Sequence, residues 1–312
     1  MRKVIRIMII LTTLLLSVNP VIGIEKEDSS TIIYFEAEDP EGDDYGPGSY
    51  IYPRNLAFKP YEGLFDLLNF CVSGNDDFIF FNIKIKSITN PWSAPEGFIH
   101  PVIHIYIDKA EGGKTKPLNE ALGVEFSPKY AWEYCLEGIG WESSMLTFVN
   151  SQGELESIRI AAHFIPEEHL IRLTVPIEVM GKPQRKWKYY VLIGSYDGFG
   201  PGFLREVRIE PGDWFFGGGC GDGAEPRVID LLAPSGGKYS QERQLSYPKK
   251  DGKPVIVYPI NIKTGIAWGY IVFPILFLLI GFLAKKRFTI FGFWLKGKDL
   301  DQPKNSSQIK NH

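Results

Sequence analysis

Cysteine and histidine are scarce in this sequence, and they form no spacing that is typical of a metal site. The 312-residue chain contains three cysteines and five histidines and has no CxxC pair. A structural zinc site needs closely spaced cysteine and histidine ligands, so the sequence does not indicate one. The odd number of cysteines leaves open which two of Cys71, Cys135 and Cys220, if any, form a disulfide.

The sequence also lacks the motifs of common enzyme classes. It contains no G-x-S-x-G nucleophile motif, no phosphate-binding glycine loop and no dinucleotide-binding fingerprint. The glycine-rich run Gly217–Gly223 precedes no helical pattern, which a phosphate-binding loop requires. Glu133, Glu137 and Glu142 are candidates for a glycosidase carboxylate pair, but one charged helix face explains them equally well. We therefore expect no catalytic residue.

Long apolar runs lie near the two ends of the chain. Residues 1–23 combine a basic start with an apolar run, which is the pattern of a secretory signal peptide. Gly265–Ala284 carries no charge and matches the thickness of a bilayer of about 30 Å. Three basic residues follow it directly, as the positive-inside rule expects for a transmembrane helix. The alternatives are an uncleaved N-terminal anchor and a buried helix of a soluble domain.

These segments define the expected topology. An exterior domain at residues 24–234 is followed by a stalk or juxtamembrane segment at 235–264, the transmembrane helix and a basic cytoplasmic tail at 285–312. The chain has a formal net charge of −3, and basic residues concentrate in the tail, so the exterior part is clearly acidic. An acidic exterior argues against nucleic acid as a partner and is compatible with cations or neutral ligands.

Alternating apolar and polar residues recur along the exterior part and predict β-strands. The expected strands are Thr31–Ala37, Phe78–Ile88, Val102–Asp108, Ser157–Phe164, Leu170–Val175, Lys186–Tyr196 and Arg205–Glu210, with Val255–Ile262 as either a last strand or an extended lead to the membrane. Helical patterns are rare, although Ser127-Pro128 predicts a short helix to about Leu136 that Gly138 stops. We predict an all-β, two-sheet antiparallel β-sandwich with a short helix.

Four carboxylates follow the first expected strand: Asp39, Glu41, Asp43 and Asp44. Carboxylates two positions apart in a tight loop can converge on calcium, which takes about six to eight oxygen ligands. The loop is not an EF-hand, because Asp44 and Tyr50 occupy the positions of its required glycine and glutamate. It is therefore either a calcium site or a solvated acidic turn.

A second loop repeats part of this pattern. Asp197 precedes an aromatic residue and a Gly-Pro-Gly run, as Asp44 does. If the flanking strands are neighbours, the two loops meet at one rim of the sandwich, and Asp197 completes the metal shell. Two unrelated turns are the alternative.

Aromatic residues in polar loops are the third feature. Trp92 follows Asn90-Pro91, and Trp214 follows Asp213 shortly before three glycines. A tryptophan ring can stack on the C–H face of a sugar while polar neighbours bind the hydroxyl groups. The alternative is that these rings only pack in the core or at its rim.

Several ordered motifs resemble the C-terminal module of glucodextranases, and related modules occur on archaeal amylopullulanases. The matching residues are Asp39-Pro40-Glu41-Gly42-Asp43-Asp44-Tyr45-Gly46-Pro47-Gly48, Tyr50, Tyr52-Pro53, Phe65-Asp66, Asn90-Pro91-Trp92, Gly97-Phe98, Tyr106-Ile107-Asp108, Gly113, Thr115, Trp132, Tyr196-Asp197, Trp214, Gly217-Gly218, Pro226 and Val228-Ile229-Asp230. The resemblance implies a sandwich similar to DOMON domains and family 9 carbohydrate-binding modules. It also implies that the domain binds sugars or attaches to the cell surface and has no catalytic activity.

Together these observations predict a membrane-anchored, non-catalytic carbohydrate-binding protein at the cell surface. We expect it to bind a poly- or oligosaccharide such as an α-glucan through Tyr45, Asn90, Trp92, Tyr196 and Trp214. We expect structural calcium at Asp39, Glu41, Asp43, Asp44 and Asp197. The alternatives are an envelope-attachment protein that binds another protein, and a haem-binding DOMON domain with Met145 or Met180 and His163 as ligands.

Overall fold

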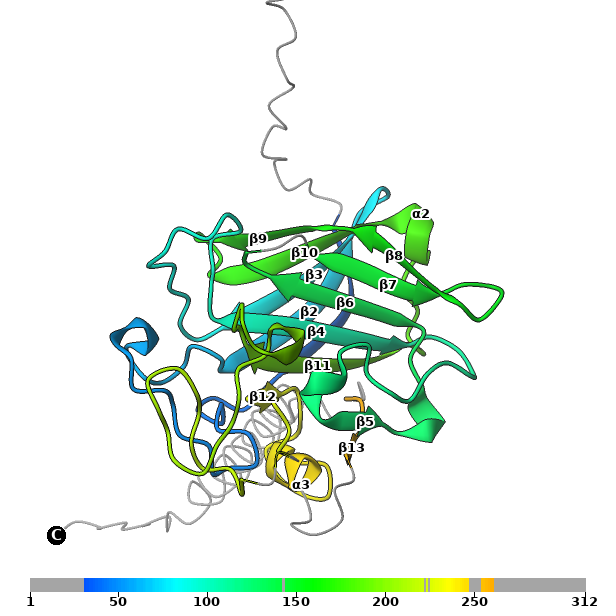
Figure 1. The fold of residues 1–312 in the computed structure, drawn as a ribbon. Helices are drawn as coiled ribbons and strands as arrows, with labels where there is room; N and C mark the ends of the chain where they lie inside the picture. The colour runs from blue at the N-terminus through cyan, green and yellow to red at the C-terminus, as the bar shows by residue number, and fades with distance from the viewer. Residues whose placement is uncertain (1–30, 142–143, 222, 224, 247–253, 261–312) are drawn as a thin grey trace, which may run out of the picture. The chain divides into compact units, whose positions relative to one another are not determined.

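Two antiparallel β-sheets form the body of the computed structural model, which describes residues 31–141, 144–221, 223, 225–246 and 254–260 (Figure 1). In this part of the chain, the five-stranded sheet has the order β1 (Ile32–Glu38), β2 (Leu67–Gly74), β3 (Phe78–Ile85), β10 (Leu170–Pro176), β9 (Ala161–Ile165). The six-stranded sheet has the order β12 (Asp230–Leu231), β11 (Lys188–Ser195), β4 (Pro101–Asp108), β6 (Tyr134–Ile139), β7 (Met145–Val149), β8 (Leu155–Arg159). The predicted all-β class is confirmed, and the two sheets are consistent with the predicted β-sandwich.

Side chains between the sheets hold them together. Phe35 of β1 and Phe70 of β2 pack against Tyr189 of β11, with ring centroids 4.7 and 5.6 Å apart. Gly138 of β6 lies so close to Leu173 of β10 that a Cβ atom on the glycine would be 2.9 Å from the leucine side chain. The sandwich interior is therefore apolar and closely packed.

The other face of the six-stranded sheet is covered as well. In β4, every residue from Pro101 to Ile107 is buried, so both faces of this strand are shielded from water. Tyr106 packs against Phe126 and Trp132, with ring centroids 4.3 and 5.2 Å apart. The covering layer contains strand β5 (Val124–Phe126) and the short 3-10 helices η2 (Glu120–Leu122) and η3 (Pro128–Tyr130). The remaining short helices are η1 (Leu56–Phe58), α2 (Ile177–Met180) and η4 (Pro201–Phe203).

The chain after Pro234 continues this covering layer. Helix α3 (Gln241–Leu245) and strand β13 (Val255–Val257), which pairs parallel with β5, place Leu245 and Val257 in the same apolar cluster as Tyr106. The described part of segment 235–264, predicted as a stalk, is therefore packed into the domain.

Both predicted apolar end segments lie outside the described residues. These are the signal peptide at 1–23 and the transmembrane helix Gly265–Ala284. Within the part of the chain that the structure describes, no helix is both long enough and apolar enough to cross a membrane.

The predicted single strand Ser157–Phe164 is wrong, because the chain changes sheets at Ile160. β8 belongs to the six-stranded sheet and β9 to the five-stranded sheet. The Ile160 side chain is buried, and its N–H donates to the Ser144 carbonyl at 2.9 Å. Since one residue makes the crossover, the alternation of apolar and polar residues gives no sign of it.

The predicted helix from Ser127 to Leu136 is also wrong. It is limited to the single turn η3, and strand β6 follows it. β6 pairs with β4 on one side and β7 on the other, and these long-range ladders outweigh the local helix-start signal. The predicted strand Arg205–Glu210 likewise contains only an isolated bridge, from Val207 to Phe216.

The packing of the C-terminal segment makes a first prediction. Leu245→Ala is expected to lower the free energy of unfolding by about 2–5 kcal/mol, because the leucine is fully buried. Ile256→Ala, at an exposed position of β13, is the matched control and is expected to change it by less than about 0.5 kcal/mol. Chemical denaturation of the purified protein measures both values. Equally small changes in the free energy of unfolding in the two variants would contradict the placement of α3 in the core.

Candidate functional site

Three aspartates come together next to β12. Asp39 follows β1, Asp43 lies in the turn after it, and Asp230 begins β12. One carboxylate oxygen from each lies within 4.8 Å of the others. Asp39 accepts the Ala233 N–H at 2.8 Å, and Asp230 accepts the Leu67 N–H of β2 at 2.7 Å. We call these three residues the aspartate trio.

Asp44 and Asp66 are also buried and act electrostatically on Asp43. The Gly42 N–H lies 3.0 and 2.9 Å from the two Asp66 carboxylate oxygens. Asp44 accepts hydrogen bonds from the Gly63 N–H at 3.1 Å and from the Tyr52 hydroxyl. Asp66 therefore holds the backbone of the acidic loop, residues 39–48, and Asp44 joins this loop to the segment at Gly63.

Burial and mutual repulsion favour the protonated forms of these acids. Burial and then the charge of Asp230 hold the pKa of Asp39 well above its usual range, and burial and then Asp43 do the same for Asp230. Burial and then Asp66 raise the pKa of Asp43 to about 7, and burial raises the pKa of Asp66 to about 6. A cation among these carboxylates would offset both causes.

Two buried oxygens of the trio have no hydrogen-bond partner among the described residues. They are Oδ2 of Asp39 and Oδ1 of Asp43. A buried polar atom without a partner is costly, and carboxylate oxygens are the ligands that calcium prefers. The aspartate trio therefore has free coordination capacity for a metal ion.

The predicted metal ligands are only partly brought together. Asp39 and Asp43 meet in the trio, whereas Glu41 is exposed and pairs with Lys86 at 3.0 Å. Asp197 pairs with Arg205 at 3.4 Å and is not part of the trio. The spacing of carboxylates within one loop predicted the first pair, but it could not predict partners from elsewhere in the chain.

Sequence reasoning from the acidic loop misses Asp230, which lies far along the chain. Its flanking residues offered a signal, because Ile229 and Leu231 are apolar. An acid inside an apolar run is usually buried, and a buried acid usually has a hydrogen-bond, ionic or metal partner. Asp230 is fully buried.

Trp92 and Trp214 form an exposed aromatic pair. Their ring centroids are 6.0 Å apart with a tilt of 40°, and the residues are 49% and 43% exposed. Trp92 comes from the loop between β3 and β4, and Trp214 from the loop between β11 and β12. The structure thus brings together two residues that sequence context predicted to bind a sugar. We call this pair the tryptophan platform.

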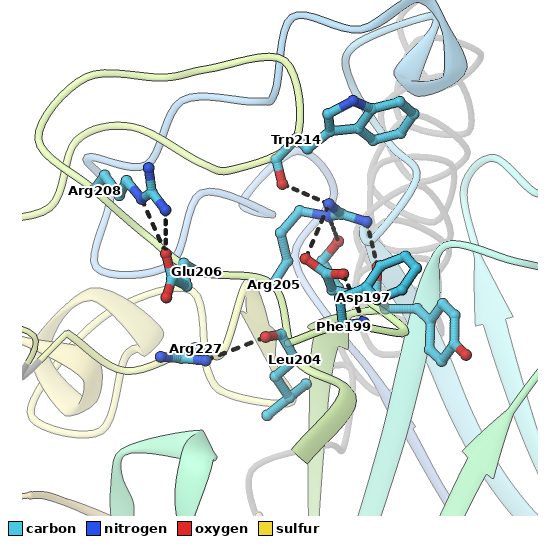
Figure 2. Close-up of polar contacts among 10 residues, drawn as sticks. Asp197, Phe199, Leu204, Arg205, Glu206, Arg208, Trp214 and Arg227 are labelled. Atoms are coloured by element: carbon cyan, nitrogen blue, oxygen red, sulfur yellow. Dashed lines mark hydrogen bonds and ion pairs between the residues drawn. The ribbon is translucent and has the colours of Figure 1, made fainter. Parts of the chain in front are cut away.

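Arg205 holds the main chain of the platform residue Trp214 (Figure 2). Its guanidinium is buried and donates to the main-chain carbonyls of Trp214 and Tyr196, while Asp197 lies at ion-pair distance. The same group stacks on the rings of Phe58 and Trp214, at 5.0 and 5.8 Å from their centroids. The role of Asp197 in this structure is therefore to neutralise Arg205.

The other predicted ligand-binding residues have different surroundings. The Asn90 side chain bonds both main-chain groups of Ala94, at 3.0 and 2.7 Å, and so shapes the loop that carries the first platform ring. Tyr196 stacks on Phe203, with ring centroids 6.2 Å apart. Tyr45 lines a separate cavity.

The residues proposed as haem ligands are dispersed. His163 is exposed on β9 and lies 3.6 Å from Glu96, Met145 belongs to β7 of the other sheet, and Met180 ends α2. The described residues therefore give the haem alternative no support.

The sheets, the loop-borne platform and the acidic loop define a β-sheet binding module. Residues 34–259 match the family model of the C-terminal binding module, SLH-like, of glucodextranase. Because the match covers most of the chain, the protein belongs to this family, and the resemblance predicted from the sequence is confirmed. The family is a binding module and not a catalytic domain. Comparison with curated proteins gives no match.

The raised pKa values predict how stability depends on pH. Asp43 and Asp66 have folded-state pKa values of about 7 and about 6, above about 3.9 for an unfolded aspartate. The folded state therefore binds more protons between these values, so stability present below pH about 4 is lost as the pH rises to about 7. Thermal unfolding in EDTA across this window measures the trend, which Asp43→Asn is expected to flatten. A melting temperature that rises with pH equally in both proteins would contradict the raised values.

Proposed function

We propose that this protein is a non-catalytic carbohydrate-binding module that holds a poly- or oligosaccharide on the tryptophan platform. The contact between Trp92 and Trp214 carries this proposal. Two large rings from distant loops are kept half-exposed against each other, although burying them would stabilise the fold. Ring faces of this kind pack on the C–H faces of sugars. Membership in a family of binding modules supports the assignment.

Rigid support of the platform favours binding. Arg205 fixes the Trp214 loop through charged hydrogen bonds, and Asn90 fixes the Trp92 loop. A site whose side chains are already ordered loses less conformational entropy when a ligand binds. The platform is therefore suited to a ligand that makes few strong contacts, such as a sugar ring that presents its C–H face to the two indoles.

Charge favours a neutral sugar over an anionic one. The acidic exterior part of the chain repels polyanions. Near the platform, the Arg205 charge is already paired with Asp197. A neutral glucan such as an α-glucan meets no such repulsion.

We further propose that the aspartate trio binds a structural calcium ion. The support is the convergence of three carboxylates, the two buried oxygens without partners and the raised pKa values. Bound calcium would compensate the negative charges of these carboxylates. Asp39, Asp43 and Asp230 would hold it.

We also propose that the module is displayed at the cell surface. The support comes from the sequence, where the signal-like residues 1–23 precede the module and Gly265–Ala284 follows it. The basic tail at 285–312 would then lie in the cytoplasm.

Attachment to an envelope component is the second candidate function, because the family description includes the term SLH-like. The two candidates differ in their ligand. The first requires binding to a soluble glycan, and the second requires a defined envelope protein as partner.

The platform assignment predicts the effect of removing each ring. Trp92→Ala and Trp214→Ala are each expected to weaken the binding of α-glucan oligosaccharides by at least about tenfold, the loss typical of a central aromatic contact. Tyr239→Ala removes a ring of similar exposure, 42%, and is the control expected to leave binding unchanged. Isothermal titration measures all three. Unchanged binding in both tryptophan variants, or binding to an envelope protein while glycans are inert, would reject the assignment.

The calcium assignment predicts a melting-temperature shift. Calcium at about 100 times its dissociation constant is expected to add about 2.7 kcal/mol of stability by mass action. Asp230→Asn is expected to abolish this calcium-dependent shift, whereas Glu41→Gln, at an exposed position in the same loop, is expected to retain it. A wild-type protein that melts at one temperature with calcium and with EDTA would overturn the assignment.

A further inference from the structure

A cavity of about 470 Å³ opens beside the acidic loop. It is lined by Tyr45, Tyr50, Ile51, Tyr52, Pro53, Arg54 and Tyr61. It is broadly open to solvent, its lining is mainly aromatic with few polar groups, and its volume lies in the range of small-molecule sites. We call it the tyrosine cavity.

Main-chain hydrogen bonds fix the walls of this cavity. The Tyr45 N–H donates to the Asp43 carbonyl at 2.6 Å, and the Tyr45 carbonyl accepts the N–H groups of Gly48 and Tyr50, both at 3.0 Å. The Tyr50 hydroxyl donates to the Pro226 carbonyl at 2.6 Å. The backbone of these walls is therefore fixed before any ligand enters.

Two polar groups at the cavity remain available to a ligand. Within the part of the chain that the structure describes, the Arg54 guanidinium and the Tyr45 hydroxyl have no hydrogen-bond or ion-pair partner. Arg54 is exposed and Tyr45 half-buried, so both can reach a molecule that enters from solvent. The Tyr52 hydroxyl, in contrast, is already bonded to Asp44.

This combination fits a neutral sugar ring. Tyrosine faces pack on C–H groups, and a guanidinium donates to neighbouring hydroxyl groups. The carboxylates of Asp44, Glu62 and Asp66 surround Tyr45 closely enough to help raise its pKa, after the larger effect of burial.

The cavity adjoins the tryptophan platform. The Arg54 N–H donates to the Gly212 carbonyl at 2.8 Å, and the Asn55 N–H donates to the Asp213 carbonyl at 3.2 Å. The segment that carries the cavity residue Arg54 therefore runs beside the segment that carries Trp214. One extended ligand can contact both.

We propose that the tyrosine cavity is a second sugar subsite, which takes a further unit of the oligosaccharide bound on the platform. This inference rests on the proposed function. It requires affinity to grow with ligand length, because a unit tethered to the platform reaches the cavity at a high effective concentration.

The test compares short and long neutral α-glucans. Malto- and isomalto-oligosaccharides of two and seven units are titrated by calorimetry into the wild-type protein and into a variant with Arg54→Ala and Tyr61→Leu. The wild type is expected to bind the longer member of at least one series about tenfold or more tightly. The double variant is expected to lose this gain while it retains binding of the two-unit sugar. Lys59→Ala, at a neighbouring exposed basic residue, is the control and is expected to keep the gain.

The outcomes separate this inference from the proposed function. A gain with length that survives in the double variant, or no gain in the wild type, overturns the subsite and leaves the platform standing. Absence of binding to both series overturns the α-glucan function and the subsite with it. Thermal melting of the double variant shows that it is folded, and Arg54→Ala alone provides the same comparison if the double variant is not.

Discussion

The arrangement of the sites depends on the hydrogen bond that the Asp230 carboxylate accepts between the two sheets. Asp230 belongs to β12 of the six-stranded sheet and accepts the Leu67 N–H of β2 in the five-stranded sheet. Asp39 makes the reciprocal link, since it follows β1 and accepts the Ala233 N–H just after β12. Two buried acids thus link the segment at β12 to strand β2 and to the end of β1 in the other sheet. Removing either one would leave a backbone N–H without its partner inside the protein.

These hydrogen bonds bring the carboxylates of Asp39 and Asp230 close together beside the acidic loop. Asp43 joins the two acids, while Gly42 and Gly63 are held by neighbouring carboxylates. Protonation of the carboxylates at low pH relieves their mutual repulsion. The backbone that results also carries Tyr45, so the wall of the tyrosine cavity is built directly on the acidic loop. The crowded carboxylates and one wall of the tyrosine cavity therefore share one segment.

The sequence predicted features that are determined by residues close together in the chain. It did not predict features that depend on contacts between distant residues. The sequence pattern predicted β1, β3, β4, β10 and β11, because burial imposes a local pattern of apolar residues. It missed β2, β6 and β7, and it carries no information on which strands pair. Asp39 and Asp43 were found because they share a loop, and Asp230 was missed because only the folded sheets bring it to them. Trp92 and Trp214 were singled out by their polar turns. Their contact with each other depends on two loops whose meeting no local pattern encodes.

The parallel pairing of β13 with β5 has a mechanical consequence. If the chain is tethered to a membrane beyond residue 260 and the module binds a polysaccharide, a pull on that ligand is transmitted to the tether through this last strand. The three-residue ladder with β5 and the hydrogen bond from the Ile260 N–H to the Tyr189 carbonyl, 3.0 Å long, would bear the load first. Force along parallel strands shears several hydrogen bonds together, whereas peeling breaks them one at a time. The short strand would then resist the separation of the membrane tether from the rest of the module.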